Sequence, residues 1–378
     1  MSFIKYIFGA AGMLAFTSGM AQAAEPYTIT VVGPITGPAA GNGADMRAGA
    51  IAAADRINAQ GGIHGQKLNL RFEDDACSET QAINVANRII GQGDKFVVGH
   101  YCSNATLPAS VIYDENGIVQ ITLSQATSIT QQNFPRLFRI TPSAEDLANG
   151  YITAVSNDIK AAAQAKLALI GNSGEYAQSI AKSLQKSLQD KGIELNYTGH
   201  YPPEDTDYSA VITRMRGARI THVMIAGSEK EMGMIVRQSA QHGFHPSFIL
   251  SSTALSAGFA GIVSCGGNGV RAVAADNPAY AAGNEALKAD LLRHGANGLD
   301  VAMFSYTAVE AFAQAFKAAG NTDAAAVSNA LHTRTFDLPT GKTGFTASGE
   351  LTHPRVITYQ YQSVNTPCTH VKPVPLTP

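Results

Sequence analysis

The 378-residue sequence contains no tryptophan and few charged residues. Charged side chains make up 15% of the chain, against roughly 25% in an average soluble domain. With 27 Lys and Arg and 29 Asp and Glu, the formal net charge is -2, so the chain lacks the basic excess of a nucleic-acid-binding protein. Hydrophobic residues still make up 45%, which indicates a folded chain rather than a disordered one. The 36 glycines, together with frequent alanine, favour close helix-to-sheet packing in an α/β protein over a β-sandwich.

The first two dozen residues lack the long apolar run of a transmembrane helix, which needs about 20 residues. Residues 1–5 carry one lysine, residues 6–16 are small and apolar, and Ala21-Gln22-Ala23 matches an A-x-A cleavage site. We expect residues 1–23 to be a signal peptide that is cleaved on export. No cysteine lies near the cleavage site, so a lipid anchor is not expected, and the mature chain should be a soluble periplasmic protein.

Four cysteines are present: Cys77, Cys102, Cys265 and Cys368. An even number in an exported chain favours disulfide bonds, and four cysteines allow three pairings. The sequence lacks the close Cys and His clusters that zinc sites need, so no metal site is expected.

The mature chain alternates short β-branched segments with amphipathic helical segments. In the first half we expect strands at 28–33, 67–73, 96–99 and 118–122, with helices near 45–58, after Ser78 and before Gly117. The pattern restarts with strands at 166–171, 193–200, 222–226 and 248–251, and with helices at 175–191, from about 208 and at about 231–241. A helix at 302–319 and a last strand at 356–362 follow. Repeated βαβ units predict an α/β protein with two doubly wound, Rossmann-like lobes.

The sequence contains no motif for a serine nucleophile elbow, a zinc protease or a dinucleotide-binding loop. The ten histidines are scattered along the chain. We therefore expect a binding protein without a cofactor, rather than an enzyme.

Two polar loops follow strands of the first half: residues 101–104, which contain Ser103, and residues 124–127. In open α/β sheets, ligands bind beyond the carboxyl ends of the strands. Hydroxyl groups and N–H groups at helix starts could hold a ligand carboxylate there. The same residues could equally serve only as helix caps.

These loops belong to a wider resemblance. The chain resembles the periplasmic Leu/Ile/Val-binding proteins of branched-chain amino-acid ABC transporters, which are type I periplasmic binding proteins. The stretches that carry the resemblance are residues 58–65, 72–77, 97–103, 126–127 and 171–176, and residues 207–209 leading to Arg214.

The resemblance implies two lobes joined by a three-strand hinge, with crossings near 137–142, 271–278 and 345–354. Lobe 1 would comprise 24–140 plus 276–350, and lobe 2 would comprise 141–275 plus 351–378. It also implies a Cys77–Cys102 disulfide. Cys265 and Cys368 would both belong to lobe 2 and could pair there.

Ligand-binding residues follow from the same resemblance. Ser103 and the N–H of Thr127 would hold the α-carboxylate of an amino acid. The Thr127 hydroxyl and the carbonyl of Gln125 would hold its ammonium, with Ala126 lying between Gln125 and Thr127. Tyr176 would lie against the ligand's side chain.

The chain departs from the family pattern at three positions. Asn42 replaces a tyrosine of the first glycine-rich loop, Gly227-Ser228-Glu229 stands where a second tyrosine belongs, and Ser252 lies in a segment without the family's ammonium-binding glutamate. A buried ammonium needs a negative partner. Either Glu229 supplies this charge, which we favour, or the ligand is another small carboxylate or amide, such as an aromatic acid or urea.

The expected partners are a small ligand, most simply an amino acid, and a membrane permease, with the protein acting as a monomer. A ligand-sensing receptor component is the alternative role.

Overall fold

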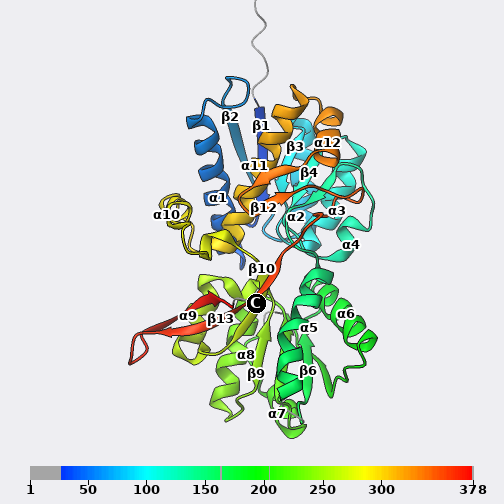
Figure 1. Ribbon diagram of the computed structural model, residues 1–378. Coiled ribbons are helices and arrows are strands. Elements are labelled where there is room, and N and C mark those ends of the chain that lie inside the picture. The colour runs from blue at the N-terminus through cyan, green and yellow to red at the C-terminus, as the bar shows by residue number, and fades with distance from the viewer. Residues whose placement is uncertain (1–26, 162–163, 204, 377–378) are drawn as a thin grey trace, which may run out of the picture.

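The computed structural model describes residues 27–161, 164–203 and 205–376. The predicted signal peptide lies outside these residues. Figure 1 shows two lobes, one above the other, and strand β10 (Arg271–Ala275) belongs to the sheet of the lower lobe. Within the described ranges, no helix has both the length and the hydrophobicity to cross a membrane.

Lobe 1 is built on a five-stranded parallel sheet with the order β2-β1-β3-β4-β5. Its strands are β1 (Tyr27–Gly33), β2 (Leu68–Asp74), β3 (Phe96–Gly99), β4 (Val119–Thr122) and β5 (Leu137–Arg139). Its first helices are α1 (Ala40–Ala59), α2 (Glu79–Gly91), α3 (Ser103–Glu115) and α4 (Thr127–Thr130). The chain later returns to this lobe with α10 (Glu285–Arg293), α11 (Leu299–Ala319), α12 (Ala324–Thr333) and the hairpin β11 (Phe336–Leu338) and β12 (Gly341–Thr343).

Lobe 2 is built on a seven-stranded sheet with the order β14-β13-β10-β9-β8-β6-β7. Its strands include β6 (Leu167–Gly171), β7 (Tyr197–His200), β8 (His222–Ala226), β9 (Ser247–Leu250), β13 (Val356–Val364) and β14 (His370–Pro375). Its helices are α5 (Ala144–Ala161), α6 (Glu175–Asp190), α7 (Ser209–Gly217), α8 (Glu229–Gln241) and α9 (Ala257–Val263), with short 3-10 turns η1 (Ser252–Leu255) and η2 (Ser264–Gly267). A third turn, η3 (Pro278–Tyr280), follows β10 and packs on α10 and α11 of lobe 1.

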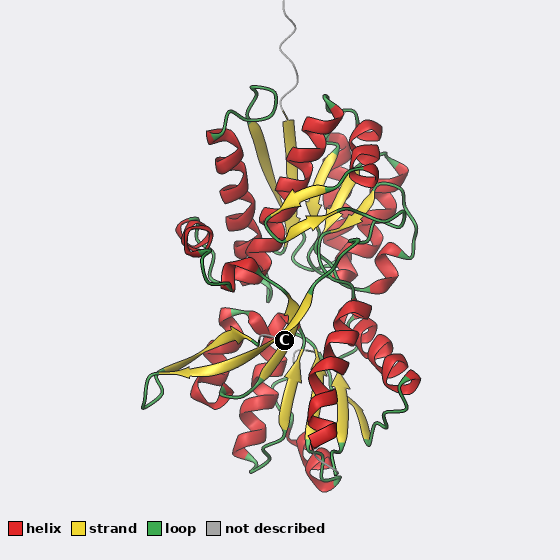
Figure 2. Cartoon of the chain, viewed as in Figure 1, coloured by secondary structure: helices red, strands yellow, loops and turns green. Residues whose placement is uncertain are grey.

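Alternating strand residues explain why helices cover both faces of each sheet (Figure 2). In β8, Val223 and Ile225 pack with α7 and α8, while Met224 and Ala226 pack with α5 and α6 on the other face. Successive side chains of a strand point to opposite faces, so a strand that is apolar throughout is buried on both. The prediction of two doubly wound α/β lobes is confirmed.

Three element predictions differ from the structure. The strand predicted at 193–200 forms only at β7, Tyr197–His200. Helix α1 begins at Ala40 rather than near residue 45, because Gly43 is inside the helix, where a Cβ would collide with the carbonyl of Pro34. Gly43 therefore allows α1 to pack closely on the chain at Pro34 and does not mark a loop. Strand β13 is also not the last strand, since β14 pairs with it antiparallel at the edge of the sheet.

Both cysteine pairs form disulfides in the structure. Cys77 and Cys102 have Cα atoms 5.3 Å apart and tie the loop after β2 to the start of α3. Cys265 in η2 and Cys368 in the turn between β13 and β14 have Cα atoms 6.0 Å apart.

The chain passes between the sheets after β5, after β10 and before β13. The predicted lobe limits at 140, 275 and 350 fall at or beside these linking segments. The limits themselves stay a prediction.

Candidate functional site

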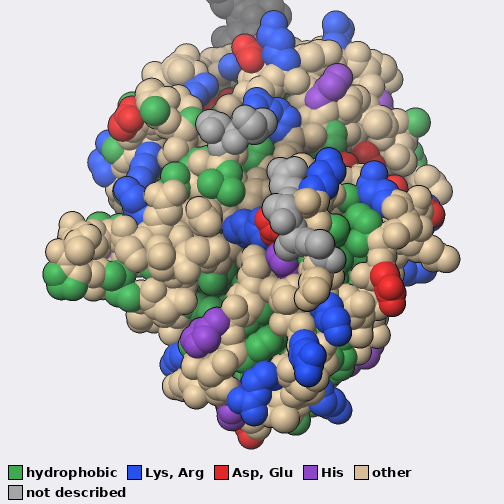
Figure 3. Space-filling model, turned by 60° about the horizontal axis from the view of Figure 1, so that its bottom comes forward, with side chains coloured by type: hydrophobic (Ala, Val, Ile, Leu, Met, Phe, Trp, Pro, Cys, Tyr) green, Lys and Arg blue, Asp and Glu red, His purple; other side chains and the backbone are tan. Residues whose placement is uncertain are grey.

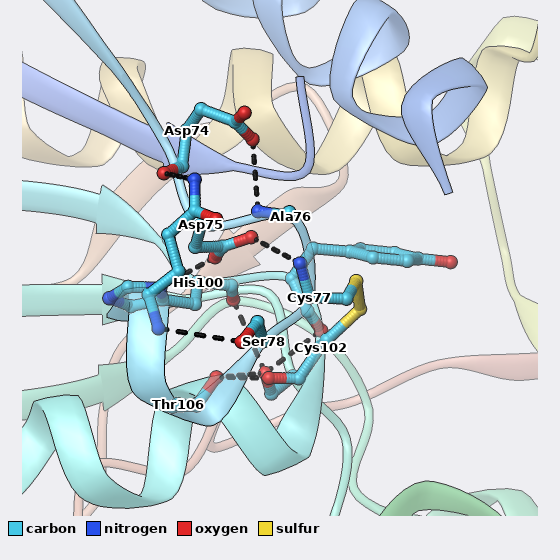
Figure 4. Close-up of polar contacts among 12 residues, drawn as sticks. Asp74, Asp75, Ala76, Cys77, Ser78, His100, Cys102 and Thr106 are labelled. Carbon is cyan, nitrogen blue, oxygen red and sulfur yellow. Dashed lines mark hydrogen bonds and ion pairs between the residues drawn. A yellow bond between two sulfur atoms is a disulfide. The ribbon is translucent and has the colours of Figure 1, made fainter. Parts of the chain in front are cut away.

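A buried contact between His100 and Asp75 holds the loop after β3 (Figure 4). His100 Nδ1 lies 2.6 Å from Asp75 Oδ2, and both side chains are fully buried. The other Asp75 oxygen accepts the Cys77 N–H at 2.9 Å, which fixes the disulfide loop. Ser103 follows as the first residue of α3 and is 3% exposed. Within the described part of the chain, no hydrogen bond involves its hydroxyl.

A buried arginine shapes the loop after β4. Arg139 donates to the carbonyls of Ser124 at 2.6 Å and Ala126 at 2.8 Å, and to Glu350 at 2.9 Å. It therefore holds the backbone that carries three of the predicted ligand residues. This role was not predicted from the sequence, because Arg139 lies in a segment that was identified only as a crossing between the lobes.

Residues of lobe 2 occupy the polar groups that the resemblance assigned to the ligand. The Thr127 N–H donates to Ser179 Oγ at 2.8 Å, and Ser179 Oγ lies 3.4 Å from the Thr127 hydroxyl. The Gln125 carbonyl accepts the N–H of Ala144 at 2.7 Å. In this conformation, a ligand that bound at Thr127 would have to displace the Ser179 hydroxyl.

Hydrogen bonds among three side chains also join the lobes near Thr127. The Ser252 hydroxyl donates to Gln125 Oε1 at 2.9 Å and lies 3.1 Å from the Tyr176 hydroxyl. Burial raises the pKa of Tyr176, so its phenol stays protonated and keeps a hydrogen to donate.

The cavity between the lobes includes only some of the predicted residues. Asn42, Gln125 and Ser252 line it. Tyr176 reaches it through its bond to Ser252, whereas Ser103, Ala126, Thr127 and Glu229 are not among the lining residues. The other lining residues are Asp45, Tyr101, Leu123, Thr253, Leu255, Ser256, Gly298, Asp300, Val301 and Phe304.

Two of these lining residues are buried carboxyl groups that the sequence analysis missed. Asp45 is 5% exposed, and burial raises its pKa to about 6. Asp300 is 6% exposed, and burial raises its pKa to about 7. No Lys or Arg lines the cavity, and no ion pair in the described ranges involves either acid. Two features of the sequence could have revealed them. Asp45 stands among the small apolar residues of α1, and Asp300 stands just before the predicted helix at 302–319.

Glu229 lies near this cavity but outside its wall. It is the first residue of α8, is half-buried, and lies against Gly258, where a Cβ would be 2.5 Å from Glu229 Oε1. Its negative charge adds to burial in raising the pKa of Asp45. Within the described residues, no group of three or more His, Cys, Asp or Glu side chains could hold a metal ion.

A family model described as a periplasmic binding protein matches residues 26–364. The chain belongs to this family. It is 31% identical over 377 residues to the leucine-, isoleucine-, valine-, threonine-, and alanine-binding protein of Pseudomonas aeruginosa, with 95% of each chain covered. It is 30% identical over 364 residues to Leu/Ile/Val-binding protein homolog 1 of Brucella abortus, covering 95% of this chain and 96% of that protein.

Solved structures share the fold of this periplasmic binding protein. The branched-chain amino acid transporter substrate binding protein LivJ from Streptococcus pneumoniae, in complex with isoleucine, has a TM-score of 0.79 at 22% identity and covers 93% of this chain and 100% of that chain. A solute binding protein from R. palustris, in complex with 4-hydroxybenzoate, has a TM-score of 0.77 at 14% identity and covers 92% and 95%. Family membership and fold are thus as the sequence resemblance implied.

Proposed function

We propose that this protein is the substrate-binding component of an ABC transport system for amino acids. It would act in the periplasm as a monomer and deliver its ligand to a membrane permease. The amino acids in the names of the Pseudomonas and Brucella relatives support this assignment. The observation that carries it is the cavity between the lobes, whose wall contains both hydrogen-bond donors and buried carboxyl groups.

Ligand capture would proceed by hinge closure. The chain passes between the sheets three times, which allows the lobes to move as rigid bodies. The contacts of Gln125 with Ser252 and of Thr127 with Ser179 join the lobes in the conformation described. An amino acid held first by lobe 1 would favour closure through its contacts with both lobes. The permease would then recognise the closed form.

The charge of the cavity argues against an aromatic acid as the ligand. Such an acid carries a carboxylate and no ammonium, so Asp45 and Asp300 would repel it when ionised. Because no basic side chain lines the cavity, nothing there offsets that repulsion. A zwitterion presents a positive group to the same acids.

A thermal-shift screen tests the proposal. Leucine, isoleucine, valine, threonine and alanine are compared with 4-hydroxybenzoate, acetamide and urea. A ligand at 100 times its dissociation constant adds about 2.7 kcal/mol to the free energy of unfolding. We expect stabilisation by at least one amino acid. Stabilisation by 4-hydroxybenzoate, acetamide or urea alone would overturn the assignment.

A further inference from the structure

We propose that Asp300, in the first turn of α11 in lobe 1, holds the ammonium group of the ligand, and that the side-chain amide of Gln125 holds its carboxylate. This inference rests on the proposed function and names the residues that make the site selective for zwitterions. It places the negative partner of the ammonium in lobe 1, instead of at Glu229 in lobe 2.

The two buried acids of the cavity wall favour a ligand with a positive group. Asp45 and Asp300 are both more than nine-tenths buried, and neither has a cationic partner in the described chain. A buried carboxylate without a partner is costly, so its retention points to a partner that arrives with the ligand.

Hydrogen bonding separates the roles of the two acids. Both Asp45 oxygens already accept backbone N–H groups, from Asn297 at 2.7 Å and from Gly298 at 3.0 Å. Asp45 thereby fixes the start of α11. Asp300 has a single hydrogen bond in the described part of the chain, from Asn277 at 3.5 Å. Since a carboxylate can accept about four hydrogen bonds, Asp300 has the capacity to accept an ammonium.

Gln125 provides the second, independent observation. Its side chain is 7% exposed and lines the same cavity. Its Oε1 accepts from Ser252, but its Nε2 has no partner in the described chain. A buried donor without an acceptor loses its hydration without compensation. The cavity thus combines an unpartnered donor for a carboxylate with an under-bonded carboxyl for an ammonium.

This arrangement accounts for the departures from the family pattern. Residues 251–253 of lobe 2 contain no acid, because lobe 1 supplies the negative charge. Lobe 2 contributes hydroxyl groups instead, from Ser252 and Tyr176. Both charged ends of the ligand would therefore be held by lobe 1 before closure.

The test compares an amino acid with its analogue that lacks the ammonium. By isothermal titration calorimetry, the tightest amino acid of the five named above is compared with its deaminated acid, which for leucine is 4-methylpentanoate. We expect the full-length wild type to prefer the amino acid at least tenfold. Asp300→Asn should remove most of this preference, because it should lower the affinity for the amino acid and leave the affinity for the deaminated acid unchanged. Gln125→Met should lower the affinity for both compounds, because both carry a carboxylate.

Glu310→Gln is the matched control, because Glu310 lies on α11, is 6% exposed and pairs with Arg56 away from the cavity. It should bind like the wild type, and the thermal midpoint of each variant reports whether it is folded. If the wild type binds amino acids but Asp300→Asn keeps the same preference, the ammonium subsite is wrong and the proposed function stands. If Gln125→Met leaves both affinities unchanged, the carboxylate subsite is wrong. If no amino acid binds the wild type, both proposals fail.

Discussion

The Ser252 hydroxyl of lobe 2 donates a hydrogen bond of 2.9 Å to the side-chain carbonyl oxygen of Gln125 in lobe 1. This contact crosses the cleft at the cavity where we place the ligand. It links the state of the hinge to the residue that we expect to hold the ligand's carboxylate. Opening of the lobes would break it together with the hydrogen bonds of Thr127 with Ser179 and of Ser128 with Glu175.

Ser179→Ala should shift the ligand-free protein toward the open form. The change removes a hydrogen bond to the Thr127 N–H, which contributes about 1 kcal/mol to the closed form. We expect a larger radius of gyration by small-angle X-ray scattering. Ser173→Ala, at an exposed position before α6, is the control. Identical scattering from all three proteins would contradict the role of this contact.

Arg139→Met should destabilise lobe 1. The change leaves Glu350 without its cation and removes the guanidinium hydrogen bonds to the carbonyls of Ser124 and Ala126. Breaking a buried ion pair typically costs about 3–5 kcal/mol, and urea denaturation measures the loss. Arg136→Met, at a partly exposed position nearby, should change stability by less than about 0.5 kcal/mol. Equal effects of the two changes would refute the buried network.

Stability without ligand should fall as the pH rises from about 4 to about 7. The pKa values of Asp45 and Asp300 are raised to about 6 and about 7, so the folded state holds protons that the unfolded state has released. Each group then contributes a slope of up to about -1.4 kcal/mol per pH unit between its unfolded and folded pKa values. Asp300→Asn should reduce this fall in urea denaturation curves measured between pH 4 and pH 8.

The tyrosines around Asp300 do not titrate in this window. Tyr101, Tyr280 and Tyr359 have pKa values that burial raises further above 10. Two results together would contradict the raised pKa values of Asp45 and Asp300. The unfolding free energy of the wild type would rise steadily between pH 4 and pH 7, and that of Asp300→Asn would rise with the same slope.

The second disulfide should stabilise lobe 2. The Cys265→Ser/Cys368→Ser variant opens a loop of 103 residues in the unfolded chain, for which chain entropy predicts a loss of about 4.7 kcal/mol. Thermal or urea unfolding measures the change. Thiol titration of the denatured wild type should find no free thiol, and two reactive thiols would show that this pair is not bonded.

The strand and helix pattern was predictable because burial on both faces leaves nearly continuous apolar strands, such as β8. The positions of the polar loops were predictable as well, because each loop begins where an apolar strand ends. The edge strand β14 was not, because Pro373 and Pro375 argue against a strand unless it lies at an edge. That position is visible only once the sheet is assembled.

The candidate site was predictable only in part. Asn42, Gln125 and Ser252 meet at the cavity. Asn42 and Ser252 were named only from the resemblance, whereas Gln125 also lies in a polar loop that follows a predicted strand. Asp300 and Arg139 have ordinary local sequences. Their importance comes from burial and from partners such as Glu350, 211 positions away, and such contacts leave no local pattern.

Calorimetric titration of the wild-type protein with leucine, isoleucine, valine, threonine and alanine tests the central claim most directly. We predict that at least one of them binds with one molecule per chain, and that Asp300→Asn weakens that binding at least tenfold. The absence of binding for all five amino acids would contradict it.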